Sequence, residues 1–80
     1  MGYSKNILFI QSFGQNLRKI RKDKGFTQEQ LANDADLGIR QISRIERGII
    51  NTSISQVFEI AQALKNHPKE LFNFPSITKT

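Results

Sequence analysis

Residues 39–47 have the spacing of a helix with one apolar face and one polar, basic face. In helical geometry Ile42 and Ile45 point toward a core. The opposite face, at positions i, i+3, i+4 and i+7, carries polar and basic side chains: Arg40, Ser43, Arg44 and Arg47, with Gln41 beside them. Arg and Gln can form bidentate hydrogen bonds with guanine and adenine in the major groove, which admits a helix. An ordinary exposed helix, the alternative, would carry mixed charges, whereas Glu46 is the only acid of this segment.

The segments before this helix predict two further helices. Phe13, Leu17 and Ile20 share one face of a helix that ends near Lys24, where Gly25 provides a left-handed stop. Its start is open, near Ile7 or near Ser12. Thr27-Gln28-Glu29-Gln30 has the form of a capping box, which predicts a second helix over about residues 28–34. A break at residues 36–38 separates it from the helix over 39–47.

The segments after residue 47 predict two more helices and no strand. Gly48 is a suitable stop for the preceding helix, and Ser53-Ile54-Ser55-Gln56 forms a second capping box. The spacing of Val57, Ile60, Ala61 and Leu64 indicates one buried stripe of a helix over about residues 54–65. Pro68 favours a short helix over residues 68–72. The expected fold is an all-α, compact five-helix bundle.

The length, charge and hydropathy of the chain limit the class of protein it can be. The chain has 80 residues, no Cys, one His and a net charge of +5, which is typical of proteins that bind polyanions. We expect one domain over 1–80 with its core at about 12–72, an N-terminal extension over 1–11 and a frayed tail over 75–80. The longest apolar run, residues 7–10, is far shorter than a membrane span or a signal-peptide core, so we expect a cytoplasmic protein.

No residue cluster supports catalysis or metal binding. Without Cys there is no disulfide and no Cys-based zinc site. His67 precedes Pro68 and is interpreted as a helix cap, and no base, nucleophile or Gly-rich phosphate loop accompanies Asp34 and Asp36. We therefore expect no cofactor, no metal and no enzymatic activity.

Particular residues resemble the Cro/CI-type (XRE-like) helix-turn-helix family, which includes phage repressors and restriction-modification controller proteins. The resemblance covers about residues 12–72. It rests on these positions: Gly14, Leu17-Arg18, Ile20-Arg21, Gly25, Thr27–Ala32, Ala35, Leu37, Ile42–Gly48, Asn51, Ser53, Ile60-Ala61, Ala63-Leu64, Pro68 and Glu70–Phe72. It implies a lambda-repressor-like domain in which the segment 28–34 supports the segment 39–47 in the major groove. It also implies a cytoplasmic protein of bacterial or phage type.

The resemblance also implies roles for single residues. The expected base contacts are Ile39, Arg40, Gln41, Ser43 and Arg44, where Ile39 could touch only a thymine methyl or a sugar. Gln28 is expected to anchor a DNA phosphate at a helix N-terminus, a position that suits anions. Further expected phosphate contacts are Arg18, Lys22, Arg47, Asn51 and Thr52.

Arg21 and Glu46 match a pair that forms a buried ion pair in parts of this family. The alternative places both side chains in solvent, where such a pair contributes less than about 1 kcal/mol.

Two positions depart from the family pattern. Asp36 stands where a turn Gly is usual, and Gly38 stands where a Ser or Thr usually caps the third helix.

The chain is rich in Phe, with six residues, and this surplus has two interpretations. In the first, the N-terminal segment with Tyr3, Ile7, Phe9 and Ile10 packs over segments 54–65 and 68–72 and completes one core. In the second, the C-terminal third forms a homodimer surface, as is common in the family. The candidate interface residues are Phe58, Leu71, Phe72 and Phe74.

Three functions remain open at this point. The leading hypothesis is a transcriptional regulator that binds a specific, roughly palindromic operator in double-stranded DNA as a homodimer. The second is an antitoxin or adaptor whose main partner is another protein; RNA polymerase and a toxin protein are the partners considered. The third is sequence-independent binding by charge, which the Gln among the Arg residues disfavours because phosphate attraction needs no Gln.

Overall fold

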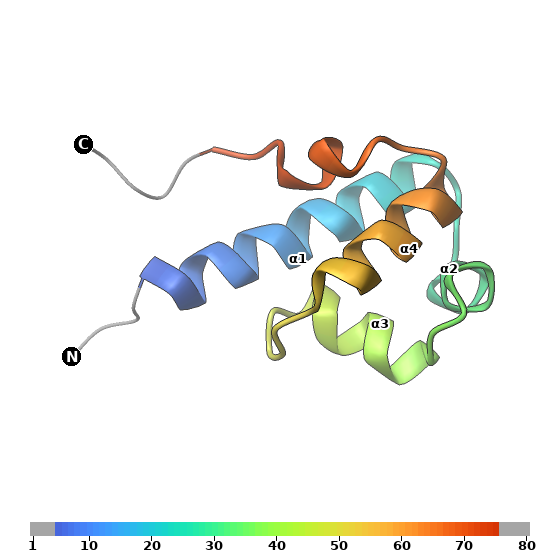
Figure 1. Ribbon diagram of the computed structural model, residues 1–80, viewed down its shortest axis with the longest axis horizontal. Coiled ribbons are helices and arrows are strands. Elements are labelled where there is room, and N and C mark those ends of the chain that lie inside the picture. Colours follow the sequence, from blue (N-terminus) through green and yellow to red (C-terminus); the bar gives the residue numbers. More distant parts are fainter. Residues whose placement is uncertain (1–4, 76–80) are drawn as a thin grey trace.

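The described part of the chain folds into four α-helices followed by a short 3-10 helix (Figure 1). The computed structural model describes residues 5–75, so Tyr3 lies outside the described residues. The elements are α1 (Lys5–Asp23), α2 (Gln28–Ala35), α3 (Ile39–Glu46), α4 (Ile54–Leu64) and the 3-10 helix η1 (Pro68–Phe72). The all-α prediction is confirmed, with the difference that the fifth helix is a 3-10 turn. Within the described residues, no helix is both long and apolar enough to span a membrane.

Local sequence sets most of the helix ends. Both predicted capping boxes are present: Thr27 accepts from the amide of Gln30, and Ser53 accepts from the amide of Gln56, with each Gln side chain reaching back to its cap. The first helix begins at Lys5, upstream of both starts considered from the sequence. The other boundaries lie within one residue of their predicted positions.

Among residues 5–75, four adopt the left-handed conformation that stops a helix or forms a turn. Gly25 and Gly48 do so with φ of 81° and 71°. Asp36 also does so, with φ 58° and ψ 43°, so the turn between α2 and α3 keeps its geometry without a glycine. Lys65 ends α4 with φ 59°, a position at which the sequence offered no helix-stop signal.

The core is a single apolar cluster to which all five described helices contribute. Its fully buried large side chains are Leu17, Leu31, Ile42, Ile45, Ile60, Leu64 and Leu71. Leu71 was a candidate dimer residue, and this assignment is wrong: its side chain is 0% exposed in the single chain and has no surface to offer a second copy. In Figure 1 η1 runs alongside α1, α2 lies at the right-hand end, and α3 lies along the lower side beneath α4.

Aromatic contacts join the start of α1 to the C-terminal segment. The Phe9 ring stacks on Phe72 with a centroid separation of 6.2 Å and lies 5.3 Å from Phe74. Phe13 lies 5.0 Å from Phe72, and Asn16 donates from Nδ2 to the carbonyls of Glu70 and Leu71. The N-terminal part of α1 therefore packs against η1, which is one part of what the first interpretation of the Phe surplus expects. A pocket lies between this part of α1 and α4, and Phe9 and Phe72 remain partly exposed.

Candidate nucleic-acid interface

Helix α3 presents a polar face to solvent. It buries Ile42, Ile45 and Glu46, and exposes Arg40 and Arg44 one helical turn apart. Ile39 at its first position is half exposed, and the predicted base-contact residues Gln41 and Ser43 are partly buried at the edges of the face. Because Gly38 has the extended backbone of an N-cap but no side-chain oxygen, the start of this helix lacks a side-chain cap.

The side chains best suited to base recognition are free of intramolecular hydrogen bonds. Within residues 5–75, Arg40, Gln41 and Arg44 form no side-chain hydrogen bond or ion pair with the rest of the chain. Arg47, by contrast, donates from Nε to the backbone carbonyl of Ser43 at 3.4 Å. Three side chains with matching donor geometry are thus available on one helix face.

A shallow hollow of about 710 Å³ lies between α1, the start of α2 and α3. It is lined by Gln11, Gln15, Arg18, Arg21, Gln28, Ser43, Glu46 and Arg47. Three of the predicted phosphate contacts, Arg18, Gln28 and Arg47, therefore lie around one depression beside the exposed face of α3. The hollow borders the N-terminal end of α2 at Gln28, where the helix dipole favours an anion.

The predicted Arg21–Glu46 ion pair is present and forms the floor of this hollow. Arg21 donates from Nε to Glu46 Oε2 at 2.5 Å and from Nη2 to Oε1 at 3.1 Å. Both side chains are buried. Arg21 also donates from Nη1 to the carbonyl of Phe26, just before the N-cap of α2, at 2.7 Å. One guanidinium thus links α1, the start of α2 and the end of α3.

A further contact of Glu46 was not predicted. Gln28 donates from Nε2 to Glu46 Oε1 at 3.0 Å. The two residues are 18 positions apart, and their contact depends on how α2 packs against α3. No local pattern in the sequence signals it.

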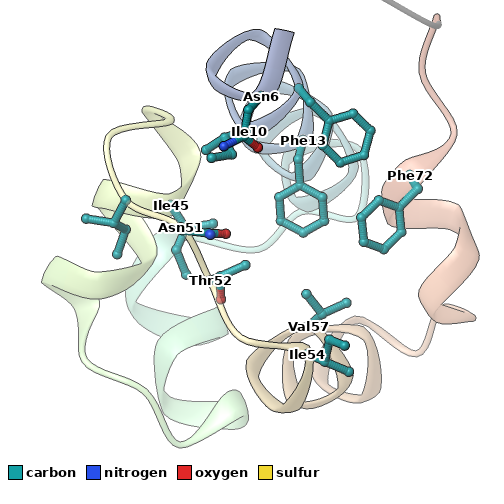
Figure 2. A pocket seen from close by; sticks show the side chains of 11 residues that line it. Asn6, Ile10, Phe13, Ile45, Asn51, Thr52, Ile54, Val57 and Phe72 are labelled. Atoms are coloured by element: carbon teal, nitrogen blue, oxygen red, sulfur yellow. The ribbon is translucent and has the colours of Figure 1, made fainter. Parts of the chain in front are cut away.

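The other predicted phosphate contacts lie elsewhere. Lys22 is exposed on α1 and does not line the hollow. Asn51 and Thr52 line a separate, mostly apolar pocket of about 230 Å³ between α1, the loop after α3 and α4 (Figure 2). Thr52 donates its hydroxyl proton to Gln56 Oε1 at 2.6 Å, so it has no proton left for a phosphate in this conformation.

Two titratable side chains outside this surface, His67 and Lys24, have structural partners. His67 Nδ1 accepts from the amide of Lys69 at 3.1 Å and caps η1. Lys24 donates from Nζ to the carbonyl of Leu64 at the end of α4, 2.8 Å away. In the part of the chain that the structure describes, no three His, Cys, Asp or Glu side chains form a group that could hold a metal ion.

An arginine-bearing helix on a two-helix unit, beside a hollow lined by Arg18 and Arg47, is the arrangement of a helix-turn-helix DNA-binding protein. A family model described as helix-turn-helix matches residues 17–71, and the chain belongs to this family. The control protein C.BamHI of Bacillus amyloliquefaciens is 44% identical over 66 residues, which is 81% of this chain and 82% of that protein. The immunity repressor protein of Bacillus phage phi105 is 41% identical over 51 residues, which is 64% of this chain and 35% of the repressor.

The fold is shared with solved structures of similar proteins. The restriction-modification controller protein C.AhdI of Aeromonas hydrophila has a TM-score of 0.78 at 40% identity, covering 79% of this chain and 96% of that one. The restriction-modification controller protein C.Esp1396I has a TM-score of 0.74 at 33% identity, covering 80% and 84%. The chain is thus a DNA-binding transcriptional regulator of the Cro/CI type, and these similar proteins are controller and repressor proteins rather than enzymes.

Proposed function

We propose that the chain binds a specific, roughly palindromic operator as a homodimer, with α3 of each copy in the major groove. The observation that carries this proposal is the exposed face of α3, where Arg40, Gln41 and Arg44 have no hydrogen-bond or ion-pair partner among residues 5–75. These are the side chains that read guanine and adenine. Two copies related by a two-fold axis would read half-sites about one helical turn apart.

The backbone contacts of this proposal centre on the hollow beside α3. Arg18, Gln28 and Arg47 surround it and would hold phosphates, while Lys22 adds a long-range attraction from α1. Asn51 would reach the backbone from the loop after α3. Such contacts fix the position of α3 along the duplex, and the contacts of α3 with bases then determine which DNA sequence is bound.

The dimer surface is proposed on the apolar face beside the pocket of Figure 2. Ile54 is 88% exposed and Phe58 50% exposed on α4, and Phe72 is 43% exposed on η1. Ile54 and Phe72 both line the pocket, and Phe74 lies against the same core. Covering such apolar groups removes them from water, which favours association with a second copy.

Regulation would then depend on the concentration of the chain itself. Dimerisation and operator binding are linked by mass action, so occupancy rises steeply as the protein accumulates. Because two of the similar structures are restriction-modification controller proteins, we propose genes of a restriction-modification system as the regulated class.

Sedimentation velocity over a range of concentrations, alone and with duplex DNA, tests the homodimer. The unaltered chain is expected to sediment as a dimer. Phe58→Glu, which places a charge on the apolar face, is expected to be monomeric and folded. Asn33→Glu, which adds the same charge to the exposed side of α2, should remain dimeric. An unaltered chain that stays monomeric throughout would contradict the proposal and favour the antitoxin or adaptor function, in which another protein covers this surface.

A further inference from the structure

The contact between Gln28 and Glu46 connects the ion pair beneath the hollow to the start of α2. Glu46 is 5% exposed and accepts hydrogen bonds from Arg21 Nε, Arg21 Nη2 and Gln28 Nε2. A carboxylate can only accept, so it fixes the orientation of the Gln28 amide with the NH₂ group toward α3. That group carries two N–H bonds, and the contact with Glu46 uses one of them.

We propose that Glu46 is a positioning residue for a DNA phosphate. It holds the Gln28 amide so that its second N–H opens into the hollow, between Arg18 and Arg47, where a phosphate oxygen accepts it. This inference rests on the DNA binding proposed above. It assigns to the ion pair a role in recognition in addition to its role in holding α1 against α3.

The electrostatics of the hollow are compatible with a phosphate despite the carboxylate. Glu46 is paired with the guanidinium of Arg21 through both of its oxygens, so its charge is neutralised at contact distance. Arg18 and Arg47 add two exposed cations at the rim. The capping box uses the backbone amides of Thr27 and Gln30 and leaves those of Gln28 and Glu29 outside it, and the dipole of α2 also favours an anion at this end of the helix.

The alternative is that Glu46 acts only on stability. Without an acceptor at position 46, the Gln28 side chain would rotate freely and lose rotamer entropy on binding a phosphate. With the acceptor, the amide is held before DNA arrives. The two accounts therefore differ in DNA affinity when the acceptor is removed without stranding a buried charge.

Two variants that both lack the ion pair separate these accounts. Arg21→Met/Glu46→Leu removes the acceptor, whereas Arg21→Met/Glu46→Gln retains a side-chain carbonyl that Gln28 Nε2 can use. Affinity for a short duplex of arbitrary sequence is measured at low salt, at a temperature where circular dichroism shows each variant folded. We expect the Leu variant to bind about fivefold more weakly than the Gln variant. With Gln28→Ala added to both, we expect the difference to disappear.

Equal affinity of the Leu and Gln variants would overturn the positioning role, and so would a difference that persists with Gln28→Ala. An unaltered chain that binds no duplex would instead overturn the proposed function. A second readout needs no change at position 46: the side-chain amide NMR signals of Gln28 in the unaltered chain are expected to shift when duplex is added. Signals that stay unchanged in a DNA-bound chain would also overturn the positioning role.

Discussion

Gly14 in α1 lies directly against the backbone carbonyl of Glu46 at the end of α3. A Cβ atom at position 14 would stand 2.7 Å from that oxygen and still closer to the carbonyl oxygen of Ile45. Gly48, just after α3, makes a similar approach, because a Cβ there would stand 2.7 Å from the Cα of Gln11. The backbone at the end of α3 thus packs directly against the backbone of α1. This contact fixes the orientation of α3 relative to α1.

Gly14→Ala is expected to destabilise the fold by about 1–3 kcal/mol, because the added methyl group meets backbone that cannot rotate away. The higher helix propensity of Ala offsets only part of this, about 1 kcal/mol. Urea unfolding followed by circular dichroism measures the effect. Gln15→Ala, at an exposed neighbour in the same helix, is the control and should change stability little. A Gly14→Ala variant as stable as the unaltered chain would show that α1 and α3 can separate at no cost.

Arg21→Met is expected to lower the free energy of unfolding by about 3–5 kcal/mol, since it leaves the Glu46 carboxylate buried and unpaired. Arg21→Met/Glu46→Leu should recover most of this loss, because no charge is then stranded in the interior. Chemical unfolding of both variants gives the comparison. If the double variant were no more stable than the single one, the ion pair would be needed for more than its own neutralisation.

Lys65→Gly is expected to stabilise the chain by about 1 kcal/mol, because Gly adopts the left-handed conformation at almost no cost. Lys65 ends α4 in this conformation, with φ 59°. Lys65→Ala removes the same side chain but keeps a Cβ atom, so it should bring no gain. Thermal unfolding distinguishes the two, and equal stability of the two variants would mean that the backbone at this position carries no strain.

Gly38→Ser is expected to add a few tenths of a kcal/mol by capping α3. Gly38 has φ −76° and ψ 147°, nearly the backbone of the two working caps Thr27 and Ser53. A Cβ atom at position 38 would project into open space, so the hydroxyl can be accommodated. Thermal unfolding should show the gain for Ser, and Gly38→Ala, which lacks a hydroxyl, should show none. A loss of stability in Gly38→Ser would indicate that the start of α3 is not held in this geometry.

Arg44→Ala is expected to cost about 1–3 kcal/mol in binding to the preferred site and to relax the preference at one base pair. Lys22→Ala should weaken binding to all duplexes alike or leave it unchanged, because Lys22 lies on α1 and not on the base-reading helix α3. Fluorescence anisotropy with the preferred site and with an unrelated duplex separates the two effects. If Arg44→Ala weakened both duplexes equally, Arg44 would contact phosphate and not a base.

The features that the sequence predicts correctly are those controlled by local interactions. The capping boxes at Thr27 and Ser53 fix two helix starts through contacts three residues apart, and Gly25 and Gly48 fix two ends by their own backbone freedom. The exposed face of α3 follows in the same way from its helical period. The expected pairing of Arg21 with Glu46 came from the family resemblance.

The remaining features depend on packing between distant segments. The start of α1 at Lys5 accompanies contacts of Phe9 with Phe72 and Phe74, which lie near the other end of the chain. Leu71 lies in a 3-10 helix of five residues, too short for periodicity to distinguish its buried side from its exposed one. The contact of Gln28 with Glu46 likewise exists only once α2 and α3 are packed together.

Base reading by α3 is tested most directly by selection from random double-stranded DNA at two salt concentrations. We expect an enriched, roughly palindromic site that persists near physiological salt, with Arg44→Ala losing the preference at one position in each half-site. Binding that enriches no sequence and vanishes as salt rises would contradict base reading, because attraction to phosphate alone behaves in that way.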